Sequence, residues 1–384
     1  MKIISVVIIC EEYPPNVAGG LGVHYFELIN ELKNLCEVNL ITARTNKNTK
    51  EEEHQKNLHI YRLLVPKSFP LNHITFNIKA LLKSLKLKKD IIHICSPFGF
   101  FNIFEKKPKI VKIHSLYNIQ KGSFLYTKIF FPIGSFIDSF LIRRSNLVLT
   151  TSKFMKKSII ESFTLNKEKV AVIYNGINKR FFSNLNKEKV KNKFGFNKKE
   201  VVIYVGRFVQ RKGALNLVKA IPDVIKKRHE TLFLFVGGGF SEGSWYEKEI
   251  KKNIEDLNIG NHVKIIPWID RDKLLEYYRA SDIFVHPADY EPFGNNVLEA
   301  MATGLPVVVS KSGGPEEIVT KNGIILNKNE PSEISKGILQ LLSDERKLKI
   351  FSKRSIIRAK HFSWKRNAED TVKLYHQVLT DQKE

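Results

Sequence analysis

The sequence predicts an α/β protein made of two doubly wound domains, each with a parallel sheet. Short Val- and Ile-rich runs alternate with longer amphipathic stretches, and the runs are almost continuously apolar, which is typical of strands covered on both faces. A chain of 384 residues is also too long for one comfortable core and suits two domains of ordinary size. Repeated strand–helix units of this kind build open parallel sheets.

Six strands are expected in the first half of the chain. They are predicted at Ile3–Ile9, Glu37–Thr42, Asp90–Ser96, Ile110–His114, Leu147–Ser152 and Val170–Tyr174. The first run is followed directly by Glu11 and Glu12 and by no small-residue cleavage site, so we interpret it as a buried strand and not as a signal peptide. No stretch approaches the roughly 20 apolar residues that a membrane-spanning helix needs.

A second set of strands follows a polar, basic segment at Gly176–Lys199, which is predicted to be a linker with one short helix. The expected strands are Val201–Val205, Thr231–Val236, His262–Pro267, Asp282–Pro287, Val307–Ser310 and Gly323–Leu326. Helices are expected at Ala214–Lys227, Lys273–Ala280 and Trp364–Leu379. We therefore divide the chain into residues 1–177, 178–361 and 362–384. Ligands of open α/β sheets bind beyond the carboxyl ends of the strands, so the site is expected in the crevice between the two sheets.

Composition restricts the class of protein further. The three cysteines lie in or beside apolar runs without paired spacing, which favours a reducing, cytoplasmic location and argues against a metal site built from cysteines. The formal net charge is +24, and residues 1–180 hold 28 basic and 13 acidic side chains. Such an excess attracts nucleic acid, anionic lipid or phosphorylated acceptors, while a solvated lysine-rich face is an equally good interpretation.

The most informative stretch is Phe284–Pro315, where a strand is followed by a loop and a helix that starts at Asn295 or Asn296. Glu291 is on the loop, and Glu299 is about one turn inside the helix. Carboxylates accept hydrogen bonds from vicinal hydroxyls, and a helix start favours phosphate. This pattern fits a ligand with sugar hydroxyls at both ends and a diphosphate between them.

Glu-x7-Glu within EPFGNNVLEAMATGLPVV resembles the signature of retaining glycosyltransferases of family 4, which have the two-Rossmann GT-B architecture. The likeness continues in VGRFVQRKG, in the strand ending VGGG at Gly237–Gly239, in VIYNGI and in the terminal FSWKRNAEDTVKLY. The resemblance implies that residues 1–177 bind the acceptor, that residues 178–361 bind a nucleotide sugar, and that residues 362–384 form a helix crossing back to the first domain.

The resemblance also implies individual roles in the second domain. Arg207 and Lys212 would bind the donor diphosphate and stabilise the leaving group without a metal ion. Glu291 would accept from donor-sugar hydroxyls, and Glu299 would hold the ribose. The remaining implied donor contacts are Gly238, Phe293, Gly294, Asn295 and Asn296. The donor would be a UDP-, GDP- or ADP-sugar, and no further cofactor is expected.

The first domain contributes weaker signals. Gly19 and Gly20 lie in the turn Ala18–Gly22 after the first strand, where glycine permits close approach to phosphate or sugar, although a plain tight turn is equally consistent. A helix is predicted over Val23–Leu35. His114 ends a strand where the family places a histidine near the reacting centre, whereas the following Ser115 departs from the Asp or Gly of many relatives.

The acceptor is expected to be a glycan or a lipid-linked molecule. Lys79–Lys89 reads as a helix with Leu81, Leu82 and Leu85 on one side and lysines on another, and the apolar Phe124–Arg144 follows. Two interpretations explain this pattern. The helix could contact an anionic membrane peripherally, on the inner face of the cell membrane, or it could pack on the protein's own sheet. A glucan or disaccharide synthase, a phosphorylase or an epimerase of the same fold stays open, as does a catalytically inactive scaffold. A nucleic-acid-binding protein is remote, because no recognition motif accompanies the charge.

Overall fold

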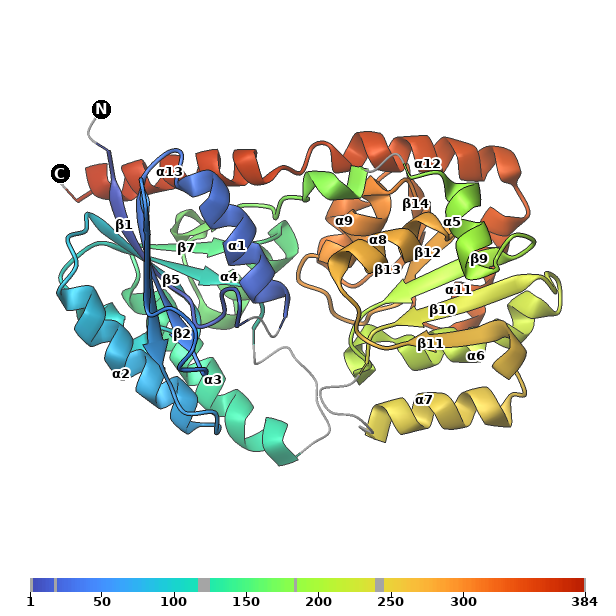
Figure 1. The fold of residues 1–384 in the computed structure, drawn as a ribbon, viewed down its shortest axis with the longest axis horizontal. Coiled ribbons are helices and arrows are strands. Elements are labelled where there is room, and N and C mark those ends of the chain that lie inside the picture. The colour runs from blue at the N-terminus through green and yellow to red at the C-terminus, as the bar shows by residue number, and fades with distance from the viewer. Residues whose placement is uncertain (1–2, 17–18, 117–124, 183–184, 239–244, 383–384) are drawn as a thin grey trace. The chain divides into compact units, whose positions relative to one another are not determined.

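The computed structural model describes residues 3–16, 19–116, 125–182, 185–238 and 245–382 (Figure 1). Ala18, Phe124 and Gly239, which belong to segments singled out above, lie outside this range. The chain divides into two compact units, one formed by Met1–Gly176 with Ser363–Glu384 and the other by Ile177–Phe362. Each unit has a parallel sheet with helices on its faces, so the predicted fold class is confirmed.

The first unit is built on a sheet with the strand order β3-β4-β2-β1-β5-β6-β7-β8. Among the described residues only β3 and β4 pair antiparallel. Every residue of β1, β5 and β6 is buried, which explains why most of their residues are apolar. The bounds are β1 Ser5–Ile9, β2 Glu37–Arg44, β3 Glu52–Gln55, β4 Leu58–Leu64, β5 Ile91–Cys95, β6 Lys109–Ile113, β7 Leu147–Thr150 and β8 Val170–Val172.

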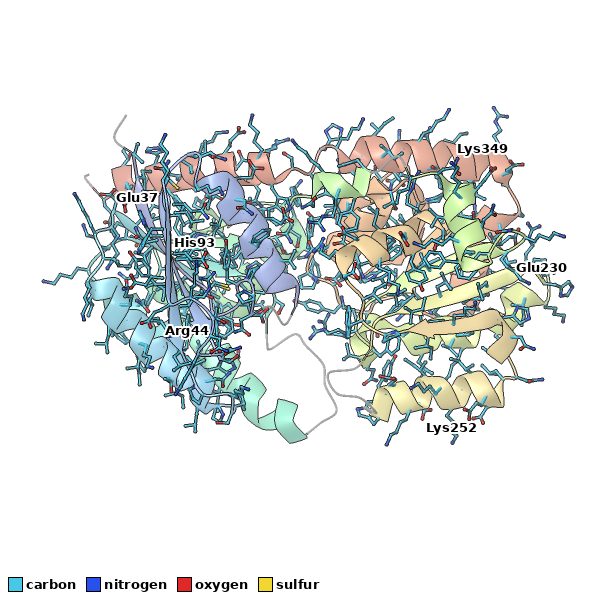
Figure 2. The ribbon with its side chains drawn as sticks, in the orientation of Figure 1. Glu37, Arg44, His93, Glu230, Lys252 and Lys349 are labelled. Carbon is cyan, nitrogen blue, oxygen red and sulfur yellow. The ribbon has the colours of Figure 1, made fainter. Side chains whose placement is uncertain are left out.

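The helices of the first unit come from both ends of the chain. They are α1 Gly20–Leu32, α2 Leu71–Leu85, α3 Leu125–Arg144, α4 Lys153–Phe163 and α13 Trp364–Thr380, with the 3-10 helices η1 Phe100–Phe104 and η2 Lys167–Lys169. Figure 1 shows α13, in red, passing next to one end of the blue α1, and the two helices pack together. The hydroxyl of Tyr375 on α13 lies 2.7 Å from Nδ1 of His93 on β5, a residue labelled in Figure 2. The last helix therefore completes the core of the first unit.

The second unit has the strand order β11-β10-β9-β12-β13-β14, all parallel. Its strands are β9 Glu200–Val205, β10 Thr231–Val236, β11 Val263–Ile266, β12 Ile283–His286, β13 Val307–Ser310 and β14 Gly323–Leu326. Its helices are α5 Lys187–Phe194, α6 Ala214–Ile225, α7 Trp245–Asp256, α8 Arg271–Arg279, α9 Asn295–Ala302, α10 Gly314–Ile318, α11 Pro331–Leu342 and α12 Glu345–Ala359, with η3 Lys179–Phe182, η4 Gln210–Lys212 and η5 Gly260–His262.

Three local expectations differ from the structure. The hairpin β3–β4 was not predicted, because its outer strand EEHQ is polar and largely exposed. The helix expected over Lys79–Lys89 is α2, which begins eight residues earlier and ends at Leu85. The segment expected as a linker with one short helix, Gly176–Lys199, contains the short helices η3 and α5, but from Ile177 onward it is part of the second unit, where Phe181 is buried.

Within the described parts of the chain, no helix combines the length and the apolar character that spanning a bilayer requires.

Candidate active site

The candidate site begins where the order of the second sheet changes direction, between β9 and β12. The strand order places β10 and β11 on one side of β9 and β12 to β14 on the other, and open α/β sheets bind ligands at such a switch point. The loops after β9 and β12 approach closely: a Cβ added to Gly213, which has a φ of +71°, would lie 1.6 Å from the carbonyl oxygen of Pro287. Glycine is therefore required at position 213 for these two loops to meet.

Lys212 and Glu291 form a buried ion pair across these loops. Lys212 ends η4 after β9, and its Nζ donates to Oε2 of Glu291 on the loop after β12. The Glu291 backbone is fixed from a third loop, because its N–H donates to the carbonyl of Ser312 at 2.9 Å and its carbonyl accepts from the N–H of Gly314 at 2.9 Å. The sheet thus brings together two residues that are 79 positions apart in the sequence.

The Glu291 carboxylate is ionised in the folded protein. Burial alone would raise its pKa, but the Lys212 ammonium and the neighbouring His286 hold that pKa well below its usual range. Nε2 of His286, the last residue of β12, lies 3.3 Å from Oε2 of Glu291. Burial lowers the pKa of His286, so this imidazole is neutral near pH 7.

Two arginines add positive charge to the same loop. Arg211 donates from NH1 to the carbonyl of Tyr290 at 3.2 Å and acts electrostatically on Glu291. Arg207 follows β9, and its carbonyl accepts from the hydroxyl of Tyr204 at 3.1 Å. Three cationic groups against one carboxylate leave this cluster with an excess of positive charge, which suits an anionic ligand.

Glu299 belongs to a second cluster, on α9. Its Oε1 accepts from NH2 of Arg271 at 2.6 Å, and its Oε2 accepts from the hydroxyl of Tyr278 at 3.2 Å. The Arg271 guanidinium lies 5.2 Å from the ring centre of Phe181. Burial raises the pKa of Glu299, while Arg271 and Tyr278 act in the opposite direction.

Asn296 connects the two clusters. Its Nδ2 donates to the carbonyl of Val205 at 2.5 Å and lies 3.4 Å from Nδ1 of His286. Its own carbonyl accepts from the hydroxyl of Tyr278 at 3.4 Å. The side chain of Asn296 therefore fixes the start of α9 against the end of β9, and its contact with the donor stays a prediction.

The other predicted donor contacts lie on the same edge of the sheet. Gly294 is the residue before α9, with a φ of +98°, and Asn295 is the first, exposed residue of that helix. The side chain of Phe293 is buried, and its ring centre lies 6.2 Å from that of Phe362. This side chain therefore packs against Phe362 inside the unit. Gly238 follows β10 and lies beside the indole of Trp268, which is 56% exposed.

The remaining predicted residues belong to the first unit. Gly19 is the exposed residue before α1, and Gly20 is the first residue of that helix. His114 directly follows β6 and is half-buried, with its ring 4.7 Å from that of His24. Burial, assisted by the nearby Lys112, lowers the pKa of His114 well below its usual value, so the ring is neutral. Lys112 is itself fully buried, its Nζ has no hydrogen-bond partner in the described structure, and burial lowers its pKa to about 7.

Sequence reasoning missed His286, Arg211, Arg271 and Tyr278. His286 could have been found, because it lies near the end of the predicted strand Asp282–Pro287, three positions before the motif DYEPFG. Arg271 and Tyr278 reach Glu299 from another helix, and no local spacing reveals that contact. Among the described residues, no group of three or more His, Cys, Asp or Glu side chains is placed to hold a metal ion.

Two family models match the chain in succession. The model for Glycosyltransferase Family 4 matches residues 18–181, and the model for Glycosyl transferases group 1 matches residues 186–358. An uncharacterized glycosyltransferase of Methanocaldococcus jannaschii, MJ1607, is 31% identical, with 97% of each chain covered.

Solved structures share the architecture. Sucrose-phosphate synthase from Thermosynechococcus elongatus superposes with a TM-score of 0.84 at 22% identity, covering 98% of this chain and 100% of that one. HepE of Anabaena, in complex with UDP-glucose, gives a TM-score of 0.78 at 19% identity, covering 97% and 100%. The architecture of both units is that of the GT-B fold. From the two family models and the full-length relative it follows that this chain belongs to the family 4 glycosyltransferases.

Proposed function

We propose that the protein transfers a sugar, with retention of anomeric configuration, from a nucleotide-sugar donor to a glycan or lipid-linked acceptor. The buried ion pair of Lys212 and Glu291 at the β9–β12 switch point carries this proposal. It sets a cation, which suits a phosphate oxygen, next to an ionised carboxylate, which suits sugar hydroxyls. The structural neighbour HepE, which was solved with UDP-glucose, supports a donor of this class.

The ligand changes the partners of this pair. Without a donor, Lys212 and Glu291 neutralise each other. A bound diphosphate offers Lys212 stronger acceptors, and the sugar hydroxyls offer Glu291 new donors in exchange. Arg207 and Arg211 on the same loop then balance the remaining negative charge, so the leaving group is stabilised by side-chain cations and a resident metal ion is not required.

The reaction breaks the bond between the sugar C1 and the diphosphate oxygen and forms a bond between C1 and the acceptor oxygen on the same face. The acceptor hydroxyl gives its proton to the departing phosphate oxygen. Glu291 and Glu299 bind hydroxyls in this scheme, with Glu299 on the ribose, and neither acts as a nucleophile. Arg207 and Lys212 are the residues that stabilise the charge developing on the leaving oxygen.

Nucleoside diphosphates test the donor site. UDP, GDP or ADP is expected to raise the Tm of the wild-type protein, because a ligand that binds the folded state stabilises it. Replacing the pair by Lys212→Met with Glu291→Gln removes both charges together, which avoids leaving one of them buried alone. This double variant is expected to lose the Tm shift and about 100-fold or more of the transfer rate.

The control is Lys219→Met, which removes an exposed lysine on α6 and should change neither property. If no nucleoside diphosphate stabilised the protein, or if the double variant transferred sugar as fast as wild type, the proposed function would be wrong. Activity that depends on inorganic phosphate in place of a nucleotide sugar would indicate a phosphorylase.

A further inference from the structure

The helix α2 exposes an apolar stripe on the side that faces away from its own sheet. The stripe consists of Leu71, Ile74, Ile78, Leu82 and Leu85, which are between 47% and 60% exposed. At 3.6 residues per turn these five positions fall within about 80° of arc. The side of α2 that packs on the unit is formed by Phe76, Asn77, Ala80 and Ser84. The stripe is therefore a second apolar face, which the described residues of the unit leave exposed.

Lysines flank this stripe, but two of them are held by the protein. Nζ of Lys79 donates to the carbonyl of Leu64, and Nζ of Lys83 donates to Glu52 at 2.6 Å. The sequence left open whether the leucines of this helix pack on its own sheet or face a membrane, and in the structure Leu82 and Leu85 do not pack on the sheet. Leu82 is 56% exposed and Leu85 is 60% exposed.

Further apolar side chains are exposed on η1 and α3. η1 packs on both α2 and α3, and the ring of Phe104 lies 5.7 Å from that of Phe140. Phe104 and Phe136 are more than half exposed, and the ring centre of Phe136 is 6.4 Å from that of Phe140. Exposed apolar groups that gather in one region of a protein mark an interaction surface.

The exposed charge around this surface is mainly positive, apart from Glu52 of β3, which pairs with Lys83. Lys67 precedes α2, Lys86 and Lys88 follow it, and Lys106 and Lys107 follow Phe104; all five are exposed. Between residues 65 and 145 the acidic residues are Asp90, Glu105 and Asp138. All three carboxylates are engaged within the unit: Asp90 accepts from the N–H of Ser5, Glu105 pairs with Lys89, and Asp138 accepts from Ser96. The outer surface of this region is therefore apolar and basic.

We propose that the stripe on α2, with Phe104 and Phe136, docks on an anionic lipid surface. The stripe offers only Leu and Ile side chains, which insert into the acyl boundary but provide no hydrogen bonds of the kind a protein interface contains. The surrounding lysines supply the electrostatic attraction to acidic headgroups. A second copy of the chain is disfavoured as the occupant, because pairing two stripes would bring like charges together.

Docking holds the first unit at the place where a lipid-linked acceptor is found, so this inference extends the proposed function but can be tested without it. The experiment is cosedimentation of the full chain with vesicles in the absence of donor. The vesicles contain phosphatidylglycerol and phosphatidylcholine in equal amounts, or phosphatidylcholine alone. Wild type is expected to sediment with the anionic vesicles, and less so as salt rises.

The double variant Ile78→Glu with Leu82→Glu should lower the vesicle partition coefficient by about tenfold or more. Both positions are exposed, so its Tm and its Tm shift with UDP, GDP or ADP should match those of wild type. The matched control is Ile357→Glu on α12 of the second unit, which changes a side chain that is 61% exposed and should leave vesicle binding intact.

The proposal is overturned if wild type fails to bind anionic vesicles at low salt, or if the α2 variant binds them as well as wild type. It is also overturned if light scattering shows a wild-type dimer that the α2 variant converts to a monomer, because the stripe would then be an interface between copies. The Lys212→Met, Glu291→Gln variant separates the two proposals. It is expected to lose sugar transfer, but its binding to anionic vesicles should match that of wild type.

Discussion

Glu291 and Glu299 lie eight positions apart, and their surroundings shift their pKa values in opposite directions. The pKa of Glu291 is lowered because an ammonium lies directly against it, whereas burial raises the pKa of Glu299. The sequence presents both simply as acidic residues of one motif. The difference arises from Lys212 and Arg271, which approach from other elements of the sheet. Residue types at a site are visible in a sequence, but their protonation depends on contacts made by the fold.

Lys112 makes the stability of the first unit depend on pH. Its folded-state pKa is about 7, against an ordinary value of 10.5, because it is buried. Between these values the unfolded chain binds a proton that the folded chain does not, so stability rises as the pH rises from 7 toward 10. Lys112→Met removes this dependence. The unfolding free energy of wild type is therefore expected to rise by about 3 kcal/mol relative to that of the variant between pH 7 and pH 10.

Urea unfolding of wild type and variant across this pH range measures the effect. The exposed Lys88→Met serves as the control and should follow wild type at every pH. A constant difference between Lys112→Met and wild type would show that Lys112 keeps its ordinary pKa in the folded protein.

The contact between the β9 and β12 loops depends on the backbone at position 213. Gly213→Ala adds a Cβ that would overlap the carbonyl of Pro287, so η4 must move and carry Lys212 away from Glu291. We expect a loss of about 2 kcal/mol or more in unfolding free energy, together with a weaker Tm shift by nucleoside diphosphates. Denaturant unfolding and thermal shift measure the two effects.

Gly195→Ala is the matched control for this prediction. Gly195 also has a positive φ, +70°, but no atom lies within 4 Å of the position its Cβ would take. This variant should lose only about 1 kcal/mol from backbone strain and keep the ligand response. Equal losses in the two variants would contradict the loop-contact explanation.

At the level of elements, the buried strands were the most predictable part of the fold. Runs such as SVVII and IIHIC are buried along their whole length, so the apolar pattern and the structural role coincide. The family resemblance and the enzyme class, read from EPFGNNVLE and VGRFVQRKG, are confirmed. The individual roles of Arg207, Lys212, Glu291 and Glu299 stay predictions.

Elements whose position depends on tertiary contacts were not predictable in the same way. The edge strand β3 reads as a polar loop, because it is extended only through its pairing with β4. For α2, the apolar residues divide between a buried and an exposed face, and periodicity alone does not distinguish the two. The partners of Glu299 come from α8, which the sequence predicted as a helix but could not place beside α9.

On the scale of the whole molecule, the two units differ in how the chain builds them. The second unit is continuous from Ile177 to Phe362, whereas the first needs residues 363–384 as well. Trp364, Ala368, Tyr375 and Val378 of α13 are part of its hydrophobic core. Removing residues 363–384 should therefore destabilise the first unit and leave the second folded.

Hydrogen exchange measured by mass spectrometry tests this at the level of strands. In the truncated chain, β1, β2 and β5 are expected to lose protection, while β9, β10 and β12 keep it. Deletion of residues 381–384 alone is the control, because it spares α13 and should preserve protection throughout. Retained protection of β1 and β5 in the longer truncation would show that α13 is dispensable for this core.

This division of the first unit also bears on biosynthesis. As the polypeptide leaves the ribosome, the amino-terminal half emerges early but lacks the helix that closes its hydrophobic interior. The central segment from Ile177 to Phe362 has every strand and helix it needs before that helix is translated. The first unit is consequently expected to finish folding after the second, and until then the apolar side chains that pack against α13 stay exposed.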